Sequence, residues 1–241
     1  MNGMLLGVLT EPGINVGNHP RFTLFGLEMN QDTVLSTLVA GGILIGLALW
    51  MRFHITDGVP SKLQLMFEGL VKFIEDLVEE GMGIRTAPFA VPLAVTLFAF
   101  ILLANWLEVV PTDHVLIAPT SDINLPAALA VLVLGWVHLF GIRKKGLIGY
   151  AKHFMGAPYW LIPFRFIEEV AKPLSLALRL FGNLFAGGLM IALIGLLPIY
   201  AIAPTEVVWK LFGMFIGLIQ ALIFSLLTIV YFSGAASEEA H

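Results

Sequence analysis

Five long apolar stretches constrain the fold of this chain more than any other feature of its sequence. Each is close to or longer than the roughly 20 residues that a helix needs to cross a bilayer. The stretches are 34–51, 87–110, 123–141, 161–197 and 206–232. The chain is 58% hydrophobic and only 12% charged, whereas soluble domains carry about 25% charged residues. We therefore predict an all-α integral membrane protein with five spans, forming a single membrane domain over residues 1–241.

The lysines and arginines gather in two of the connections and so predict the orientation. They are Arg52, Lys62, Lys72 and Arg85 after the first stretch, and Arg143, Lys144, Lys145, Lys152 and Arg165 around the connection between the third and fourth. By the positive-inside rule the N-terminus is outside and the C-terminus is cytoplasmic. Residues 1–33 then form an outer segment. We expect no secretory signal there, because residues 1–10 lack a basic start.

Residues 61–81 are a different kind of element. Apolar residues recur there at helical spacing, with charged residues on the other side. Ser61 with Gln64 is typical of a helix start, and Gly81 of a helix end. We predict an amphipathic helix that lies along the cytoplasmic interface. The alternative is an ordinary amphipathic helix on a small soluble subdomain.

Several kinds of chemistry find no support in the sequence. The chain has no cysteine, which excludes disulfides, thiol catalysis and thiolate metal sites. The histidines show no metal-ligand spacing, and the glycines near residue 185 are followed by no Lys-Ser/Thr, so they form no phosphate loop. The net charge of −4 does not favour a nucleic-acid partner. We therefore expect no catalytic site, no metal and no cofactor.

The last two stretches are too long for upright spans. A helix over 164–197 would extend roughly 51 Å, whereas the hydrocarbon core is about 30 Å thick. This segment must therefore tilt strongly, kink at Pro173 or project into the cytoplasm. Together with the last stretch, we predict a long, tilted helical hairpin over 161–232.

Arg179 lies inside the first helix of this hairpin, with apolar residues on both sides. Arginine stays protonated, and placing it at the bilayer centre costs roughly 2.5–3.5 kcal/mol on insertion scales. Glu168, on the same helical face, is about 16 Å away along the axis. We therefore expect the counter-charge to belong to another subunit. The alternative is a side chain that reaches out to the interface.

Two lines of polar and small residues run along the hairpin at intervals of three or four. One line is Glu168, Lys172, Ser175, Arg179 and Asn183, and the other is Glu206, Lys210, Gly213, Gly217 and Gln220. Gly213 and Gly217 also fit a common pattern of close helix packing. Packing therefore explains these two glycines as well as a functional role does.

The residues around Arg179 resemble those of a known family. The motifs are EVAKPLSL at 169–176, LRLFGN at 178–183, QALIF at 220–224, LTIVY at 227–231, NWLE at 105–108 and SDIN at 121–124. They are similar to subunit a of the F-type ATP synthase. Residues 84–100 resemble the actinobacterial members of that family. The resemblance implies a non-catalytic, proton-conducting stator subunit in a bacterial plasma membrane. Its partners would be a ring of c subunits, the peripheral-stalk b subunits and the rest of the complex.

The resemblance also implies roles for individual residues. Arg179 matches the essential arginine that separates two half-channels, and Asn183 and Gln220 match positions beside it. The outer half-channel would hold Asn105, Glu108, Ser121, Asp122 and Asn124, with Glu206 as a further candidate. The cytoplasmic half-channel would hold Glu168, Glu169, Lys172 and Ser175, although a surface ion pair between Lys172 and a glutamate is an alternative.

The sequence departs from many relatives at two positions. Gly188 and Gly213 stand where those relatives carry titratable groups, so the inner end of the outer half-channel must be wet or use other residues. The rival function is a self-contained secondary ion transporter. Such a protein typically has broken helices in related halves, and the absence of an internal repeat argues against it.

Overall fold

The computed structural model of the chain describes residues 21–24, 27–55, 60–85, 87–109, 118–155 and 162–236. At 21–24, 27–29, 82, 108, 151–155, 162, 165–166, 169 and 183–184 it describes the backbone alone. The elements are β1 (Arg21–Leu24), β2 (Leu27–Asn30), α1 (Gln31–His54), α2 (Lys62–Met82), α3 (Ala90–Trp106), α4 (Asn124–Met155), α5 (Ile162–Ile194) and α6 (Ile199–Ala236). Two short 3-10 turns, η1 (Leu107–Val109) and η2 (Pro119–Ser121), lie between α3 and α4.

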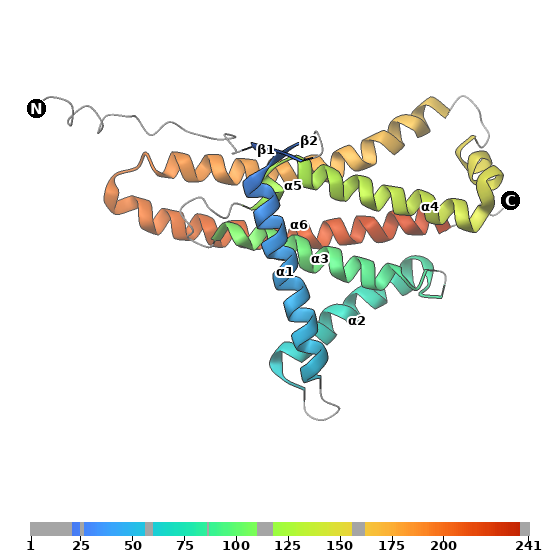
Figure 1. Ribbon diagram of the computed structural model, residues 1–241, viewed down its shortest axis with the longest axis horizontal. Helices are drawn as coiled ribbons and strands as arrows, with labels where there is room; N and C mark the ends of the chain where they lie inside the picture. The colour runs from blue at the N-terminus through green and yellow to red at the C-terminus, as the bar shows by residue number, and fades with distance from the viewer. Residues whose placement is uncertain are drawn as a thin grey trace, which may run out of the picture.

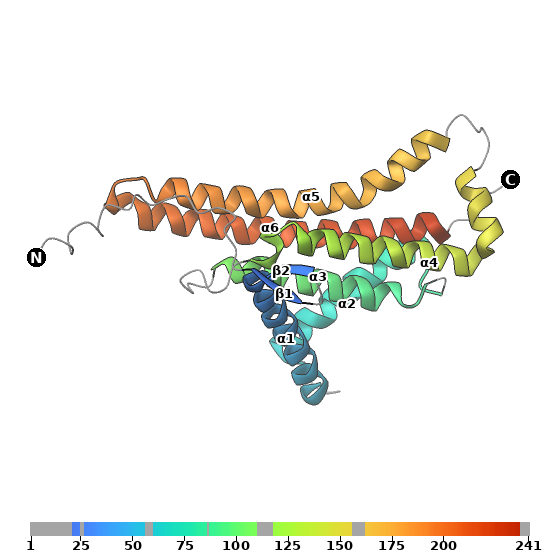
Figure 2. The ribbon, with the colours of Figure 1, turned by 45° about the horizontal axis from the view of Figure 1, so that its top comes forward.

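α4, α5 and α6 form one layer of helices, and α1 crosses this layer. Figure 1 shows α4, α5 and α6 aligned along the long axis, with α5 and α6 side by side, while α1 crosses them steeply. The same layer is seen from another side in Figure 2, where α5 bends away from α6 toward its N-terminal end. Pro173 lies inside α5, and a proline in a helix interior removes one backbone hydrogen bond and bends the axis.

A short antiparallel β-ribbon precedes α1, so the expectation of an entirely α-helical chain was incomplete. β1 and β2 pair from Arg21 with Asn30 to Leu24 with Leu27, and two residues connect them, a length that β-hairpins favour. Apolar and polar residues alternate over 22–24 and 27–29, which is the period of a strand.

The observed helices differ in length from the predicted spans. In the described part of the chain, α1, α4, α5 and α6 are long and apolar enough to cross a membrane, whereas α3 has 17 residues. α6 begins at Ile199 rather than 206 and contains Pro204. A proline in the second turn costs a helix only one backbone hydrogen bond, so Pro204 does not prevent α6 from beginning earlier.

α4 extends beyond the predicted 123–141 and turns at Gly146. This glycine has a φ of 71°, a conformation that favours glycine. The chain after it folds back, and the Tyr150 hydroxyl lies 2.6 Å from Nδ1 of His138. An added Cβ at Gly141 would lie 2.5 Å from the Tyr150 ring, so a glycine is required there as well.

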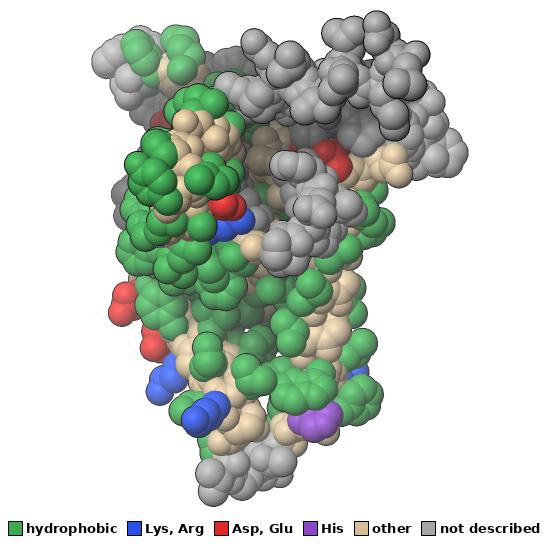
Figure 3. All heavy atoms as spheres, turned by 90° about the vertical axis from the view of Figure 1, so that its left-hand side faces the viewer, with side chains coloured by type: hydrophobic (Ala, Val, Ile, Leu, Met, Phe, Trp, Pro, Cys, Tyr) green, Lys and Arg blue, Asp and Glu red, His purple; other side chains and the backbone are tan. Residues whose placement is uncertain are grey.

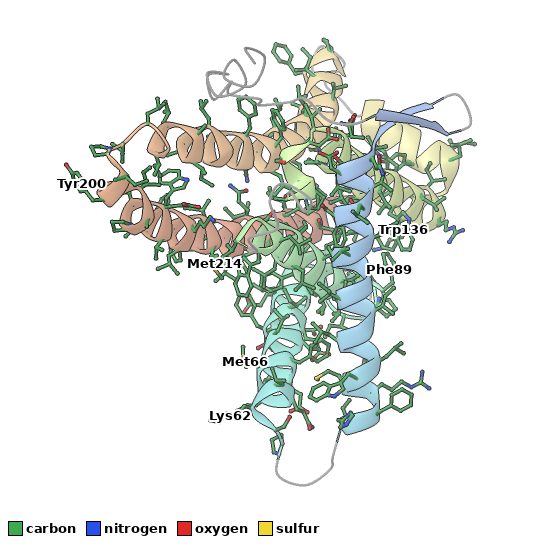
Figure 4. All side chains as sticks on the ribbon, turned by 60° about the vertical axis from the view of Figure 1, so that its left-hand side comes forward. Lys62, Met66, Phe89, Trp136, Tyr200 and Met214 are labelled. Carbon is green, nitrogen blue, oxygen red and sulfur yellow. The ribbon has the colours of Figure 1, made fainter. Side chains whose placement is uncertain are left out.

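α2 is the predicted amphipathic helix, displaced by one residue. The Ser61 hydroxyl accepts a hydrogen bond from the Gln64 backbone N–H at 3.2 Å, as expected for a cap. The helix ends at Gly83, not Gly81, because Gly83 has a φ of 74° and donates to the carbonyls of Val78 and Glu79. Its buried residues Ile74 and Val78 pack on α3. Met66, nearer the start, is 72% exposed and lies away from the α4–α6 layer (Figure 4).

The main core joins α3, α4, α5 and α6. Its buried residues include Ile101, Val133, Leu180 and Phe224, one from each helix. An aromatic group extends it, with the Phe89 ring 5.3 Å from the ring of Phe232 and 6.1 Å from the ring of Trp136, whose place is labelled in Figure 4. Burial on these faces holds α5 and α6 in place and determines which of their sides stay open.

The two glycines on α6 are not equivalent. A Cβ added at Gly217 would lie 3.0 Å from the Cβ of Asn105 on α3, whereas a Cβ at Gly213 would meet nothing within 4 Å. Close helix packing therefore accounts for Gly217 but not for Gly213.

We expect Gly217→Ala to destabilise the protein by about 1–3 kcal/mol, because the added methyl group overpacks the α3–α6 contact. Gly213→Ala is the matched control and should be neutral or stabilising by up to about 1 kcal/mol, since alanine favours a helix. The measurement is the thermal midpoint of the purified protein in detergent. Equal midpoints for the two variants would contradict the distinction.

Candidate functional site

Arg179 lies on the open side of α5. Its neighbours Leu176 and Leu180 are buried in the core, while Arg179 itself is exposed, as are Leu174 and Leu178. Within the described residues the guanidinium makes no hydrogen bond and no ion pair. Because arginine keeps its proton, a fixed positive charge stands on this open side of α5, flanked by exposed leucines.

The polar line on α5 continues from Arg179 toward the N-terminal end of the helix. Ser175 is exposed, and the Lys172 ammonium lies 3.4 Å from the Glu168 carboxylate. The same ammonium is 5.9 Å from the centre of the Tyr231 ring on α6. The pair of Lys172 and Glu168 fits the surface ion pair that the sequence left as an alternative. Glu168 is mostly exposed, so the pair contributes little stability.

A groove lies toward the other end of α5, between that helix, α6 and the end of α3. It has a volume of about 150 Å³, and its lining includes Gly187 and Met190 from α5, Lys210, Gly213 and Met214 from α6, and Asn105 from α3. The indole N–H of Trp209 donates to the Gly187 carbonyl at 3.3 Å and so joins the two helices beside it. Gly187 follows Arg179 by eight residues, or about 12 Å of helix.

An ion pair lies at the edge of this groove. The Lys210 ammonium is 2.6 Å from the Glu206 carboxylate, and the two side chains are 26% and 35% exposed. Figure 3 looks onto the end of the molecule that holds the α5–α6 connection, where hydrophobic side chains surround an acidic and a basic group. Figure 4 shows Tyr200 at that end and Met214 farther along α6, where it passes α3.

Asn105 connects the groove to a buried polar network. Its side-chain N–H donates to the Gly217 carbonyl at 3.2 Å, and its oxygen accepts from the Thr120 hydroxyl at 2.8 Å. The Trp106 indole N–H donates to the Met214 carbonyl at 3.1 Å. α6 therefore presents two backbone carbonyls to α3. The buried Asn105 satisfies that of Gly217, as burial requires, and the exposed Trp106 bonds to that of Met214.

Asp122 holds the starts of α1 and α4 together. One carboxylate oxygen accepts from Asn30 at 2.7 Å and from Thr33 at 2.8 Å, and the other accepts from the backbone and side-chain N–H groups of Asn124 at 3.1 and 2.9 Å. The side chain is 8% exposed. Burial alone raises the pKa of Asp122, but the hydrogen bonds from Asn124, Thr33 and Asn30 outweigh it and leave the pKa below its usual 3.8.

The lowered pKa predicts how stability depends on pH. The pKa of Asp122 is lower in the folded than in the unfolded protein. The ionised carboxylate therefore stabilises the fold above about pH 3.8, and this stabilisation is lost as the pH falls through the folded pKa. We expect Asp122→Asn to destabilise the protein at pH 7 by roughly 1.5–3 kcal/mol, since charged hydrogen bonds are lost. The difference in thermal midpoint from the unchanged protein should shrink below pH 3.8. A difference that is constant with pH would show that the charge of Asp122 is not involved.

The structure brings together only some of the expected site residues. Asn105 belongs to a buried network at the end of α3, and Asp122 with Asn124 to a part-buried one at the start of α4. Ser121 donates to the Ala118 carbonyl at 2.7 Å, which closes η2. Gln220, like Arg179, bonds to none of the described residues. The side chains of Glu108, Glu169 and Asn183 lie outside the described residues. Among the described side chains, no group of three or more carboxylates and imidazoles is arranged to hold a metal ion.

Some residues of these networks have no clear signal in the sequence. Asn30, Thr33 and Thr120 contact Asp122 or Asn105 across long separations in the chain, and the sequence around them contains no motif that would have singled them out. The pairing of Lys210 with Glu206 was visible in principle, because the two residues are four positions apart on one helical face.

Comparison with known proteins gives a consistent result. A family model described as the ATP synthase A chain matches residues 34–233. The chain is 46% identical over 240 residues to a protein of Mycobacterium tuberculosis named ATP synthase subunit a, with 95% of this chain and 96% of that protein covered. A protein of the same name from Acidothermus cellulolyticus is 44% identical over 230 residues, covering 95% and 85%. Another, from Desulforamulus reducens, is 33% identical over 244 residues, covering 96% and 92%.

Proposed function

Because this chain belongs to the ATP synthase A chain family, we propose that it is the proton-conducting stator subunit of a rotary ATP synthase. It is a multi-pass membrane component of that complex and carries out no bond chemistry itself. The observation that carries the proposal is Arg179, a permanent cation on the open side of α5 with no counter-charge among the described residues. Such a charge is suited to carboxylates that pass it on a rotating ring of c subunits.

Arg179 would act on each ring carboxylate in turn. A cation nearby favours the ionised form of a carboxylate, so an arriving protonated group releases its proton before it passes. Since the guanidinium does not itself lose a proton, it also blocks direct passage of protons along α5. Asn183 and Gln220 would complete this region beside the ring.

The groove provides the outer half-channel in this proposal. It begins about 12 Å along α5 from Arg179 and lies near the connection between α5 and α6, which the distribution of basic residues places outside. Asn105 lines it and Glu206 lies at its edge. The resemblance assigns four more residues to the same half-channel: Glu108, Ser121, Asp122 and Asn124. Protons would leave toward the cytoplasm past Glu168, Glu169, Lys172 and Ser175.

The proposed placement in the bacterial plasma membrane uses α1, α3, α4, α5 and α6 as five spans. α3 covers about 26 Å and η1 extends it, which is close to the thickness of the hydrocarbon core. α1 crosses α5 and α6 steeply (Figure 1), so these helices cannot all be upright. In this placement α5 and α6 are strongly tilted, and α2 lies along the cytoplasmic interface. The peripheral-stalk b subunits would hold this subunit against the ring.

The test is isolation of the intact complex through a tag on this chain, followed by reconstitution into vesicles. We expect the ring and stalk subunits to co-purify and the vesicles to take up protons when ATP is supplied. A chain that purifies alone, and that moves ions without ATP, would instead be a secondary transporter.

A further inference from the structure

The exposed side of α4 carries an apolar stripe that leads to a basic residue. Leu132, Trp136 and Leu139 recur at intervals of four and three residues, and they are 47%, 48% and 47% exposed. Arg143 follows Leu139 by four residues and is exposed as well, so it lies on the same helical face. α4 meets the core through another face, where Val133 is fully buried. The described part of the chain therefore leaves the stripe uncovered.

The stripe has about the length of one lipid chain. Arg143 follows Leu132 by 11 residues, or about 16 Å of helix, and an acyl chain spans half of the roughly 30 Å hydrocarbon core. Gly135 lies within the stripe, and a Cβ added there would meet nothing within 4 Å. No described side chain therefore fills the space between Leu132 and Leu139. An acyl chain that lies on the stripe would bring its headgroup to Arg143.

Two adjacent cations stand where that headgroup would lie. Arg143 bonds to none of the described residues, and its guanidinium presents five N–H donors in a planar fork that matches a phosphate. Lys144 is also exposed, and its ammonium donates to the Ala236 carbonyl at 2.7 Å. An ammonium has three N–H donors, so this bond leaves two of them for a second acceptor.

The turn after these cations adds apolar surface. The chain changes direction at Gly146 (Figure 2), and the next two residues, Leu147 and Ile148, are 70% and 73% exposed. A soluble phosphate would contact the cations but leave this surface and the stripe uncovered. A neutral lipid would cover the apolar residues but leave the cations without an anion. A lipid with an anionic headgroup matches both features, as basic residues at the cytoplasmic ends of membrane helices commonly do.

We propose that the face of α4 from Leu132 to Arg143, together with Lys144, is a binding site for an anionic phospholipid. The phosphate contacts the two cations, and one acyl chain lies along the stripe. Because Lys144 already bonds to the end of α6, the lipid also links α4 to α6. The inference requires only that the chain spans a membrane and is independent of the proton path proposed above.

The experiment detects the lipid directly. Photoreactive benzoylphenylalanine replaces Leu139, and the intact complex is reconstituted into phosphatidylcholine vesicles that contain a minor fraction of phosphatidylglycerol. After illumination, the lipids attached to this chain are identified by mass spectrometry. We expect phosphatidylglycerol to exceed its share of the bilayer by roughly fivefold or more, since each basic side chain near an anionic lipid contributes about that factor. Added inorganic phosphate should not reduce this enrichment, because the free ion cannot occupy the stripe.

Variants at Arg143 test the role of the charge. Arg143→Gln should lower the enrichment by roughly fivefold, and the complex should still assemble, because Arg143 bonds to none of the described residues. Arg143→Lys should keep most of the enrichment. Arg52→Gln is the matched control, since it removes another exposed arginine at the end of a membrane helix, and it should change nothing at Leu139.

A second labelling position distinguishes this site from any apolar helix that ends in an arginine. Leu49 on α1 is 48% exposed and is followed by Arg52, which has no basic residue beside it. Phosphatidylglycerol should be enriched clearly less at Leu49 than at Leu139. Equal enrichment at the two positions would overturn the proposal, as would enrichment that survives Arg143→Gln. Adducts at Leu139 with another protein subunit in place of lipid would show that a partner helix covers the stripe and would overturn it as well.

Discussion

Replacing Arg179 with alanine should abolish proton-driven ATP synthesis while the complex still assembles. The loss should be on the order of 100-fold or more, the effect expected when a preorganised charge is removed. Assembly should survive because Arg179 lies on the open side of α5 and bonds to none of the described residues, so that no internal contact is broken. Passive proton leak through vesicles should rise, since the barrier between the two half-channels is gone.

Arg179→Lys is the sharper variant. It keeps a positive charge but replaces a planar, permanently protonated group with an ammonium that can lose its proton when desolvated. We expect it to fail in synthesis as well. The control is Arg52→Ala, which removes an exposed arginine in the last turn of α1 and should synthesise ATP normally. Synthesis at a normal rate by Arg179→Ala would rule out the mechanism, whereas normal synthesis by Arg179→Lys alone would show that any cation suffices.

Filling the groove should have the second largest effect. Gly213→Phe places a benzyl group in the open space beside Lys210, where a Cβ meets nothing within 4 Å. The fold should tolerate the substitution, but the groove of about 150 Å³ would be largely occupied. We expect proton transport to fall roughly tenfold or more, because conduction depends on the width of the passage.

Proton pumping and passive proton flow should fall together in this variant, while the thermal midpoint of the complex stays close to normal. Gly213→Ala is the control and should conduct normally, since a methyl group leaves most of the groove open. Unimpaired pumping by Gly213→Phe would show that protons reach Arg179 by another route.

The family resemblance read from the residues around Arg179 is confirmed by the match to the family model and to relatives at 44–46% identity. The helical elements were also predictable in kind, because apolar runs of membrane length and the amphipathic pattern of α2 are local features of the chain. Helix ends were predicted less well. The last helix was expected to begin at 206 but begins at Ile199, and the amphipathic helix was expected to end at Gly81 but is capped by Gly83. Helix ends depend on small differences between neighbouring conformations.

The role of individual polar residues could not be read in the same way. Asp122 matched a half-channel position, but its two oxygens accept hydrogen bonds from Asn30, Thr33 and Asn124. This arrangement favours an ionised residue that holds two helix starts together. The partners Asn30 and Thr33 are about 90 residues away in the chain, so no local pattern could have identified them.

By itself, the sequence determined that this chain consists largely of membrane helices and that one of them carries an arginine within its apolar run, because apolar length and fixed charge are properties of a segment taken alone. Only the tertiary structure decided which glycine on α6 serves packing and which opens a groove, and that Lys210 rather than Glu206 lines it. Gly213 and Gly217 lie on one face of the same helix and look alike as sequence. They differ because Asn105 of α3 reaches one of them and not the other, and such a contact depends on how the helices pack.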